Sequence, residues 1–130
     1  MTSLVIDVRP ARIGDAGPLA DVYSTAWREA YSGIIPAITL ERMIARRGAS
    51  WWRSVLKRRS ILVLDVGGTV AGYATFAPAP TRGHPAAAEV QELYLRPEYQ
   101  GIGLGARLFG AVLKRIKARG YVRALVRALA

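Results

Sequence analysis

The chain has 130 residues and is strongly basic, because 19 Lys and Arg against 9 Asp and Glu give a formal net charge of +10. It has no cysteine and a single histidine, which excludes disulfides, cysteine nucleophiles and thiolate or histidine-cluster metal sites. No apolar run approaches the ~20 residues of a membrane span, so we expect one soluble, cytoplasmic domain over residues 1–130, without membrane contact or metal.

The first half of the chain predicts a strand followed by helices. Alternating apolar and polar residues predict a strand over Leu4–Arg9. Asp15 is placed to cap a helix that runs to Tyr31, in which apolar residues recur at helical spacing. Two shorter helical segments follow, around Leu40–Arg46 and Trp51–Lys57.

The second half predicts a hairpin, a strand, a helix and a last strand. Ile61–Val66 and Val70–Ala77 are rich in strand-forming residues, and the Gly-Gly-Thr between them favours a tight turn. We expect a strand over Glu89–Leu95, a helix over Leu104–Arg119 and a strand over Tyr121–Leu129. This order predicts a mixed α/β or α+β domain.

A glycine-rich turn, Gln100 to Gly105, lies between the expected strand and helix in this second half. Glycines let a ligand reach the backbone without meeting a Cβ, and a helix N-terminus adds unpaired N–H groups and the positive end of the dipole. The turn can therefore hold a pyrophosphate. It matches neither the dinucleotide fingerprint nor a Walker phosphate loop, and a purely structural turn is the alternative.

The turn resembles the acetyl-CoA signature of the GNAT superfamily of N-acetyltransferases. The resemblance rests on Gln100-x-x-Gly103-x-Gly105 after Leu93-Tyr94-Leu95-Arg96-Pro97. In the first half, Val8-Arg9-Pro10-Ala11 and the segment from Trp27 to Pro36 are similar to many bacterial members. The resemblance extends from about Val5 to Gly120. It implies a mostly antiparallel central sheet flanked by helices, with acetyl-CoA as co-substrate.

The resemblance also implies which residues bind acetyl-CoA. Backbone N–H groups of the turn would hold the pyrophosphate, and the pantetheine arm would pair with the preceding strand like an added strand. The residues implied are Leu93, Tyr94, Leu95, Gln100, Gly101, Ile102, Gly103, Leu104, Gly105 and Ala106. Arg107 or Lys114 could contact the 3′-phosphate, although a solvated helix face explains both.

For catalysis, the resemblance implies a strand glutamate that acts as a base through water. Glu89 holds that position, the alternative being a strand-edge carboxylate paired with an arginine. Glu92 is the fallback base, and period-two alternation places it on the opposite face from Glu89 and Leu93. A backbone N–H near Leu93 would polarise the thioester carbonyl. Trp27 and Tyr31 lie where family members line the acceptor site, although their spacing fits core packing equally well.

The chain departs from the family pattern at its C-terminal end. Most members continue with a helix and further strands, whose tyrosine protonates the leaving thiolate, whereas this sequence stops at Ala130. We therefore expect the last helix and strands to be lacking and assign no general acid. The exposed edge of the last strand predicts a homodimer. His84, in a Gly/Pro loop, is interpreted as a solvated surface residue.

Three functions follow from these observations. The leading hypothesis is an acetyl-CoA-dependent N-acetyltransferase acting on a primary amine of a small molecule or a protein. The second is a catalytically weak acyl-CoA-binding remnant of the family. The third, a small basic nucleic-acid-binding protein, is supported by charge alone, since the chain lacks the aromatic–basic interleaving of common RNA-binding sheets.

Overall fold

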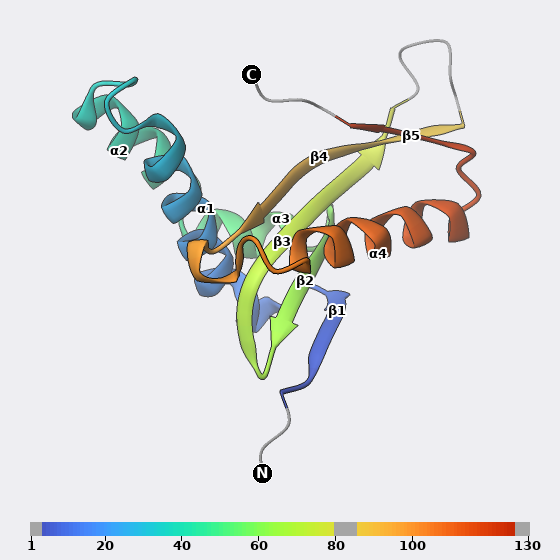
Figure 1. The fold of residues 1–130 in the computed structure, drawn as a ribbon. Coiled ribbons are helices and arrows are strands. Elements are labelled where there is room, and N and C mark those ends of the chain that lie inside the picture. The colour runs from blue at the N-terminus through green and yellow to red at the C-terminus, as the bar shows by residue number, and fades with distance from the viewer. Residues whose placement is uncertain (1–3, 80–85, 127–130) are drawn as a thin grey trace.

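The computed structural model describes residues 4–79 and 86–126. Its centre is a five-stranded sheet in the order β1-β2-β3-β4-β5, with helices on both faces (Figure 1). The strands are β1 (Ile6–Pro10), β2 (Ser60–Val66), β3 (Thr69–Pro78), β4 (Ala87–Leu95) and β5 (Arg123–Val126). The helices are α1 (Ala16–Tyr31), α2 (Ala37–Ala45), α3 (Ala49–Val55) and α4 (Leu104–Ala118), with short 3₁₀ helices at Ile13–Asp15 and Pro97–Tyr99.

The sheet is mostly antiparallel, as expected from the family resemblance. β1, β2, β3 and β4 pair antiparallel in chain order, and β5 joins β4 in parallel after the crossover helix α4. The hairpin between β2 and β3 turns at Gly67 and Gly68, whose φ angles of 59° and 90° are accessible to glycine at little cost. The predicted mixed α/β class is therefore confirmed.

Each face of the sheet carries its own apolar core. On one face α4 packs residues with helical spacing against β2, β3 and β4; these helix residues are Leu104, Leu108, Val112 and Ile116. On the other face α1 and α3 contribute buried side chains, namely Leu19, Val22, Tyr23, Trp52 and Val55. The amphipathic pattern of the sequence thus correctly predicts the inner side of α4.

The first predicted helix begins where expected, but its capping differs. α1 begins at Ala16, and the Asp15 side chain makes no capping hydrogen bond to it. The Asp15 carboxylate instead accepts from the Arg12 N–H at 2.7 Å and pairs with the Arg9 guanidinium at 2.8 Å. Burial raises the pKa of Asp15, but the bonds from Arg9 and Arg12 outweigh it and hold the pKa below its usual value.

The predicted last strand, Tyr121–Leu129, is described over a shorter range. β5 covers Arg123–Val126, and residues 127–130 lie outside the described part of the chain, as does His84. Tyr121 packs against the α4 core. No helix in the described part of the chain is long and apolar enough to span a membrane.

A β-bulge in β4 breaks the alternation of its side chains. Thr75 and Phe76 are neighbours in β3, yet they pair with Glu92 and Val90 of β4, which leaves Gln91 as an extra residue. A bulge of this kind reverses the face of every residue that follows it, relative to strict period-two alternation.

The prediction that Glu89 and Glu92 lie on opposite faces is therefore wrong. Val90, before the bulge, and Leu93, after it, both pack against the core of α4. Glu89 and Glu92 consequently both lie on the face of α1 and α3. The sequence pattern could not indicate this, because the bulge is defined by pairing with β3.

Candidate functional site

The glycine turn connects β4 to α4, as the sequence predicts. Gly101 and Gly103 have φ angles of 78° and 86°, in the left-handed region that favours glycine. In the part of the chain that the structure describes, no atom outside the chain neighbours lies within 4 Å of where a Cβ on either residue would stand. The backbone of the turn is therefore open to a ligand.

The turn also presents backbone donors that the protein leaves unused. Between residues 101 and 106, no backbone N–H donates to a backbone carbonyl of the described residues. The first backbone bond of this end of α4 runs from the Arg107 N–H to the Gly103 carbonyl, at 3.2 Å. Unpaired N–H groups at a helix N-terminus can bind an anion, so the turn keeps the features on which the prediction of a pyrophosphate site rests.

Two side-chain features hold the turn against β4. The Gln100 amide donates from Nε2 to the Leu95 carbonyl at 3.1 Å, which closes the segment between strand and turn. A Cβ on Gly105 would lie 3.2 Å from Leu95 Cδ1, so glycine lets α4 approach the strand closely. Leu104 is buried beside them. The predicted residues Leu95, Gln100, Leu104 and Gly105 are thus brought together.

Arg96, just before the turn, ties the end of β4 to β3 and α1. Its backbone N–H donates to the Ala71 carbonyl at 2.8 Å, and its Nε donates to the Val70 carbonyl at 2.8 Å. Its Nη1 pairs with the Asp21 carboxylate of α1. Sequence reasoning missed this role, because the partners of Arg96 on β3 and on α1 lie far away in the sequence.

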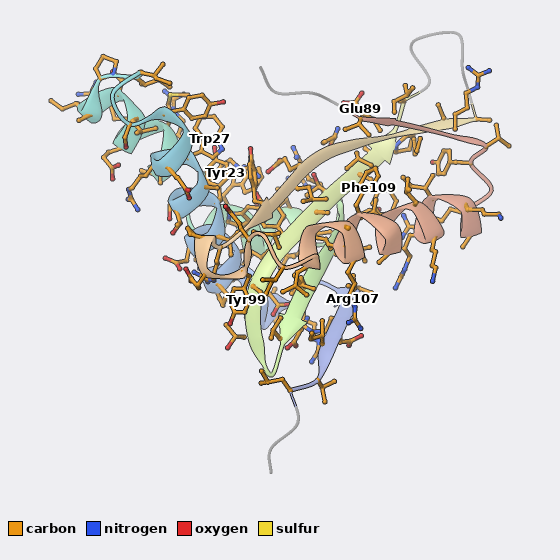
Figure 2. The ribbon with its side chains drawn as sticks, viewed as in Figure 1. Tyr23, Trp27, Glu89, Tyr99, Arg107 and Phe109 are labelled. Atoms are coloured by element: carbon orange, nitrogen blue, oxygen red, sulfur yellow. The ribbon has the colours of Figure 1, made fainter. Side chains whose placement is uncertain are left out.

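A groove lies between α1 and the end of β4, next to the turn. It is a cavity of about 400 Å³ lined by Ala26, Glu29, Ala30, Leu93, Tyr94, Leu95 and Gln100. Leu93 and Leu95 pack against the core of α4, whereas Tyr94 packs on the α1 face. Figure 2 shows Trp27 on α1, on one side of this region, and Tyr99 and Arg107 towards the turn and the start of α4.

The outer edge of β4 is only partly covered by β5. The described part of β5 pairs with Ala87 to Val90. Within the described residues, no strand pairs with that edge at Leu93 or Leu95. An extended ligand can add to a strand edge of this kind through main-chain hydrogen bonds. The pairing of the pantetheine arm with Leu93 and Leu95 stays a prediction.

Glu92 lies in a buried polar cluster under α1 and α3. Its Oε1 accepts a hydrogen bond from the Tyr73 hydroxyl at 2.7 Å, and both carboxylate oxygens accept from Arg47 Nη2, at 3.1 and 3.2 Å. Burial, together with the charge of Glu92, raises the pKa of Tyr73 well above its usual value, so the phenol stays neutral and donates. The oxygens of Glu92 are therefore already engaged.

Arg47 is enclosed by aromatic rings. Its guanidinium carbon lies 4.1 Å from the ring centroid of Tyr23, 4.2 Å from that of Trp51 and 4.9 Å from that of Trp52. Burial lowers the pKa of Arg47, but the charge and hydrogen bond of Glu92, together with Tyr73 and Tyr23, outweigh this effect and the net pKa is raised. No local sequence pattern predicted this cluster, because Arg47 stands in a run of other arginines.

Trp27 and Tyr31, the predicted acceptor-site residues, belong to a line of aromatic rings along α1. Trp27 is half-buried between Tyr23 and Tyr31, at centroid separations of 5.2 and 4.9 Å. Burial, and secondarily the charge of Glu92, raises the pKa of Tyr94, which packs on the same face of the sheet. These rings contribute to the core and also border the α1 side of β4.

Glu89, the predicted base, lies before the bulge in β4. It pairs across the sheet with Ala77 of β3 and Leu125 of β5. Its side chain is partly buried, and its Oε1 is shielded from solvent (Figure 2). Glu89 therefore shares the α1 face with Glu92 and Tyr94. Among the described residues, no group of three or more His, Asp and Glu could hold a metal ion.

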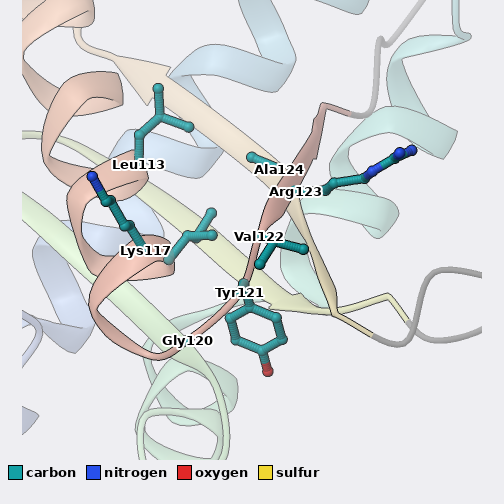
Figure 3. A pocket seen from close by; sticks show the side chains of 8 residues that line it. Leu113, Lys117, Gly120, Tyr121, Val122, Arg123 and Ala124 are labelled. Carbon is teal, nitrogen blue, oxygen red and sulfur yellow. The ribbon is translucent and has the colours of Figure 1, made fainter.

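A second hollow, of about 510 Å³, lies between the end of α4 and β5 (Figure 3). Leu113, Tyr121 and Val122 contribute to its lining, and Val122 is 78% exposed. It contains none of the predicted binding or catalytic residues and lies at the opposite end of α4 from the glycine turn. It is therefore separate from the candidate site.

Comparison with known proteins decides the family. The family model described as the acetyltransferase (GNAT) family matches residues 19–129. The chain belongs to this family. The predicted family and enzyme class, N-acetyltransferase, are thereby confirmed. This GNAT chain is 26% identical over 117 residues to the uncharacterized N-acetyltransferase YuaI of Bacillus subtilis (strain 168), which covers 90% of this chain and 68% of YuaI.

Solved structures share the fold of this GNAT chain. The PaiA N-acetyltransferase of Thermoplasma acidophilum, in complex with coenzyme A, superposes with a TM-score of 0.82 at 22% identity, over 95% of this chain and 79% of that one. A GNAT family acetyltransferase of Brucella melitensis, in complex with acetyl-CoA, gives a TM-score of 0.68 at 21% identity, over 97% and 77% of the two chains. These neighbours support the fold; the roles of individual residues stay predictions.

Proposed function

We propose that this chain transfers the acetyl group of acetyl-CoA to a primary amine of a small molecule or a protein. One observation carries the proposal: the unused N–H groups of residues 101–106 lie at the start of α4, beside an open edge of β4. A donor array of this kind suits a pyrophosphate, and the edge suits an extended arm. Coenzyme A combines both features, and two structural neighbours are complexes with coenzyme A or acetyl-CoA.

The shape of the turn supports the proposed binding of acetyl-CoA. The open space over Gly101 and Gly103 leaves room for phosphate oxygens next to the backbone. When bound, acetyl-CoA supplies a thioester carbonyl as the acyl donor. The Leu93 N–H, on the open side of β4, is our candidate for polarising that carbonyl. Arg107 is partly engaged elsewhere, since its Nη2 donates to the Ile6 carbonyl at 3.1 Å.

Glu89 is our candidate for the base. An acceptor ammonium has a pKa near ~10 and must lose a proton before it can attack. Glu89 and Glu92 lie on the same face, but the oxygens of Glu92 already accept from Tyr73 and Arg47. Glu92 is thus less available to take a further proton, which favours Glu89, acting through water. Trp27 would line the acceptor side.

The test is the release of free thiol from acetyl-CoA across a panel of amines. We expect turnover with at least one amine, and we expect Glu89→Gln to lower kcat by about 10²–10⁴-fold while the Kd for acetyl-CoA is unchanged. Glu98→Gln is the matched control, because Glu98 is exposed in the 3₁₀ helix after β4. Full activity of Glu89→Gln would refute the role of Glu89. Thermal stabilisation by acetyl-CoA without turnover on any amine would favour a binding-only protein.

We further propose that a second copy of this chain covers β5 and the hollow beside it. Val122 and Val126 are 78% and 60% exposed, and within the described residues no strand pairs with the outer edge of β5. Exposed apolar edges of this kind favour pairing with another chain. Light scattering after size exclusion should give the mass of a dimer, and Val122→Asp should reduce it to a monomer. A monomeric unmodified protein would refute this proposal.

A further inference from the structure

A third concave surface, which we call the basic pocket, lies at the C-terminal end of α4. It forms where this helix meets the α3–β2 connection and the end of β1, and its volume is about 270 Å³. Its lining includes the cations Lys57, Arg58, Arg59, Arg115 and Arg119, together with Ser60. No acidic residue belongs to this lining in the described part of the chain.

The cations of the basic pocket differ from the four arginines that form ion pairs elsewhere in the described part of the chain. Arg9, Arg28, Arg47 and Arg96 each form an ion pair with a carboxylate. None of the five cations of the basic pocket does so with a described residue. Their charges are therefore concentrated in one hollow, and no carboxylate of the described residues pairs with them.

Part of the basic pocket is held in place by neighbouring side chains. Arg119 Nη1 donates to Ser60 Oγ at 2.7 Å, and the guanidinium carbon lies 5.0 Å from the Phe76 ring centroid. The guanidinium carbon of Arg59 lies 5.3 Å from the Trp51 ring centroid. Because Ser60 Oγ accepts from Arg119, its own hydroxyl proton can be donated to a ligand. The pocket thus offers positioned donors as well as charge.

We propose that the basic pocket binds a small anion with two or more phosphate groups, such as the diphosphate of a nucleotide. Guanidinium groups bind phosphate oxygens with paired, charge-assisted hydrogen bonds. Five cations around a pocket of this volume match several negative charges on a compact molecule. A walled hollow favours such an anion over the extended backbone of a nucleic acid or a flat membrane surface.

The basic pocket is distinct from the glycine turn. The turn lies at the N-terminus of α4, whereas Arg115 and Arg119 lie at its C-terminal end. A helix of 15 residues is roughly 22 Å long. The two sites also differ in chemistry, because the turn offers backbone N–H groups and the basic pocket offers side-chain cations. The proposal therefore goes beyond acetyl transfer.

Calorimetric titration of inorganic pyrophosphate tests the proposal. The protein is first saturated with coenzyme A, so that any pyrophosphate site at the turn is filled. We expect binding at one site that weakens as salt is added. Arg58→Ala/Arg115→Ala should raise the Kd by roughly tenfold or more. The control Arg42→Ala/Arg46→Ala removes the same charge from exposed positions on and next to α2 and should leave the Kd unchanged within about twofold.

Several outcomes would overturn the proposal. The first is the absence of pyrophosphate binding, and the second is an equal rise of the Kd for pyrophosphate in both double variants. The third is tighter binding of duplex DNA or of phosphatidylserine vesicles that pyrophosphate does not displace. If Arg58→Ala/Arg115→Ala does not fold by circular dichroism, Lys57→Gln replaces it and should weaken binding by about threefold or more. Unchanged binding in that variant would also count against the basic pocket.

Discussion

The two faces of the sheet are built from different side chains. The face under α4 is mostly aliphatic, with Leu64, Leu108 and Val112 fully shielded from solvent. The face under α1 and α3 instead packs the rings of Trp52 and Tyr73 around buried polar groups. Aliphatic burial is non-directional, whereas a buried ion pair is stable only with good geometry and further hydrogen bonds.

The two faces therefore have different roles: one positions α4, and the other carries the polar side chains near the candidate site. The aliphatic face fixes α4 on the sheet and so determines where the N–H groups of the glycine turn point. The aromatic face carries Glu89, Glu92 and Tyr94, which border the side where an acceptor would approach. The predictions below test whether the faces respond differently to substitution, starting with the largest expected effect.

The largest effect is expected on the aromatic face. Glu92→Ala leaves the buried Arg47 cation without its carboxylate, and should lower the free energy of unfolding by about 3–5 kcal/mol. Urea denaturation measures this change in the free energy of unfolding. Arg47→Leu/Glu92→Leu removes both charges and should regain more than half of the loss. If the single substitution costs less than about 1 kcal/mol, the Arg47–Glu92 pair does not organise this face.

On the aliphatic face, Leu108→Ala creates a cavity and should lower the free energy of unfolding by about 3 kcal/mol. Leu108 has no exposed surface and belongs to the core under α4. Unlike Glu92→Ala, Leu108→Ala should regain no stability when a second substitution removes Arg47. A double-mutant cycle with Arg47→Leu measures this, and a coupling above about 0.5 kcal/mol would show that the faces are not independent.

The glycine turn gives a smaller, local effect. Gly103→Ala forces an alanine to a φ of 86° and should cost about 1–2 kcal/mol. Gly110→Ala, in the middle of the same helix with open space around the added Cβ, should instead stabilise by about 1 kcal/mol. Thermal denaturation with and without acetyl-CoA should show a reduced ligand-induced shift only in Gly103→Ala. Equal shifts in the two variants would argue against ligand binding at the turn.

The smallest effect at neutral pH concerns the hydroxyl of Tyr73. Tyr73→Phe loses its bond to Glu92 and should cost about 1 kcal/mol. Burial raises the pKa of Tyr73 in the folded state, so the neutral phenol is favoured there. Its contribution to stability is complete below the unfolded pKa of about 10 and falls as pH rises towards the folded pKa. Denaturation between about pH 8 and 11 should show a shallower alkaline loss in Tyr73→Phe than in the unmodified chain.

Local sequence signals predicted several features correctly. The Gly-Gly hairpin, the position of the glycine turn and the inner face of α4 all follow from φ preferences or periodicity over a few residues. The order of strands and helices was also predictable, because each element carries its own apolar pattern. Boundaries differed by a few residues, as in α2, which begins at Ala37 instead of Leu40.

Features that depend on distant partners were not predictable. The Arg96–Asp21 pair joins β4 to α1, and the Arg47–Glu92 pair joins the α2–α3 connection to β4. The bulge at Gln91 exists only in relation to β3 and reverses the predicted face of Glu92. Neither pairing nor register is encoded in the local pattern of either partner.

The sequence by itself determined that a turn rich in glycine would follow a strand and open a helix, because positive φ angles and helix-end N–H groups are local properties. It also carried the family resemblance that the comparisons confirm. Only the tertiary structure decided the face and the hydrogen-bond partners of Glu92, since these depend on the bulge in β4 and on the contacts with Arg47 and Tyr73. It likewise gathered the five cations of the basic pocket, which the folded chain alone brings to one end of α4.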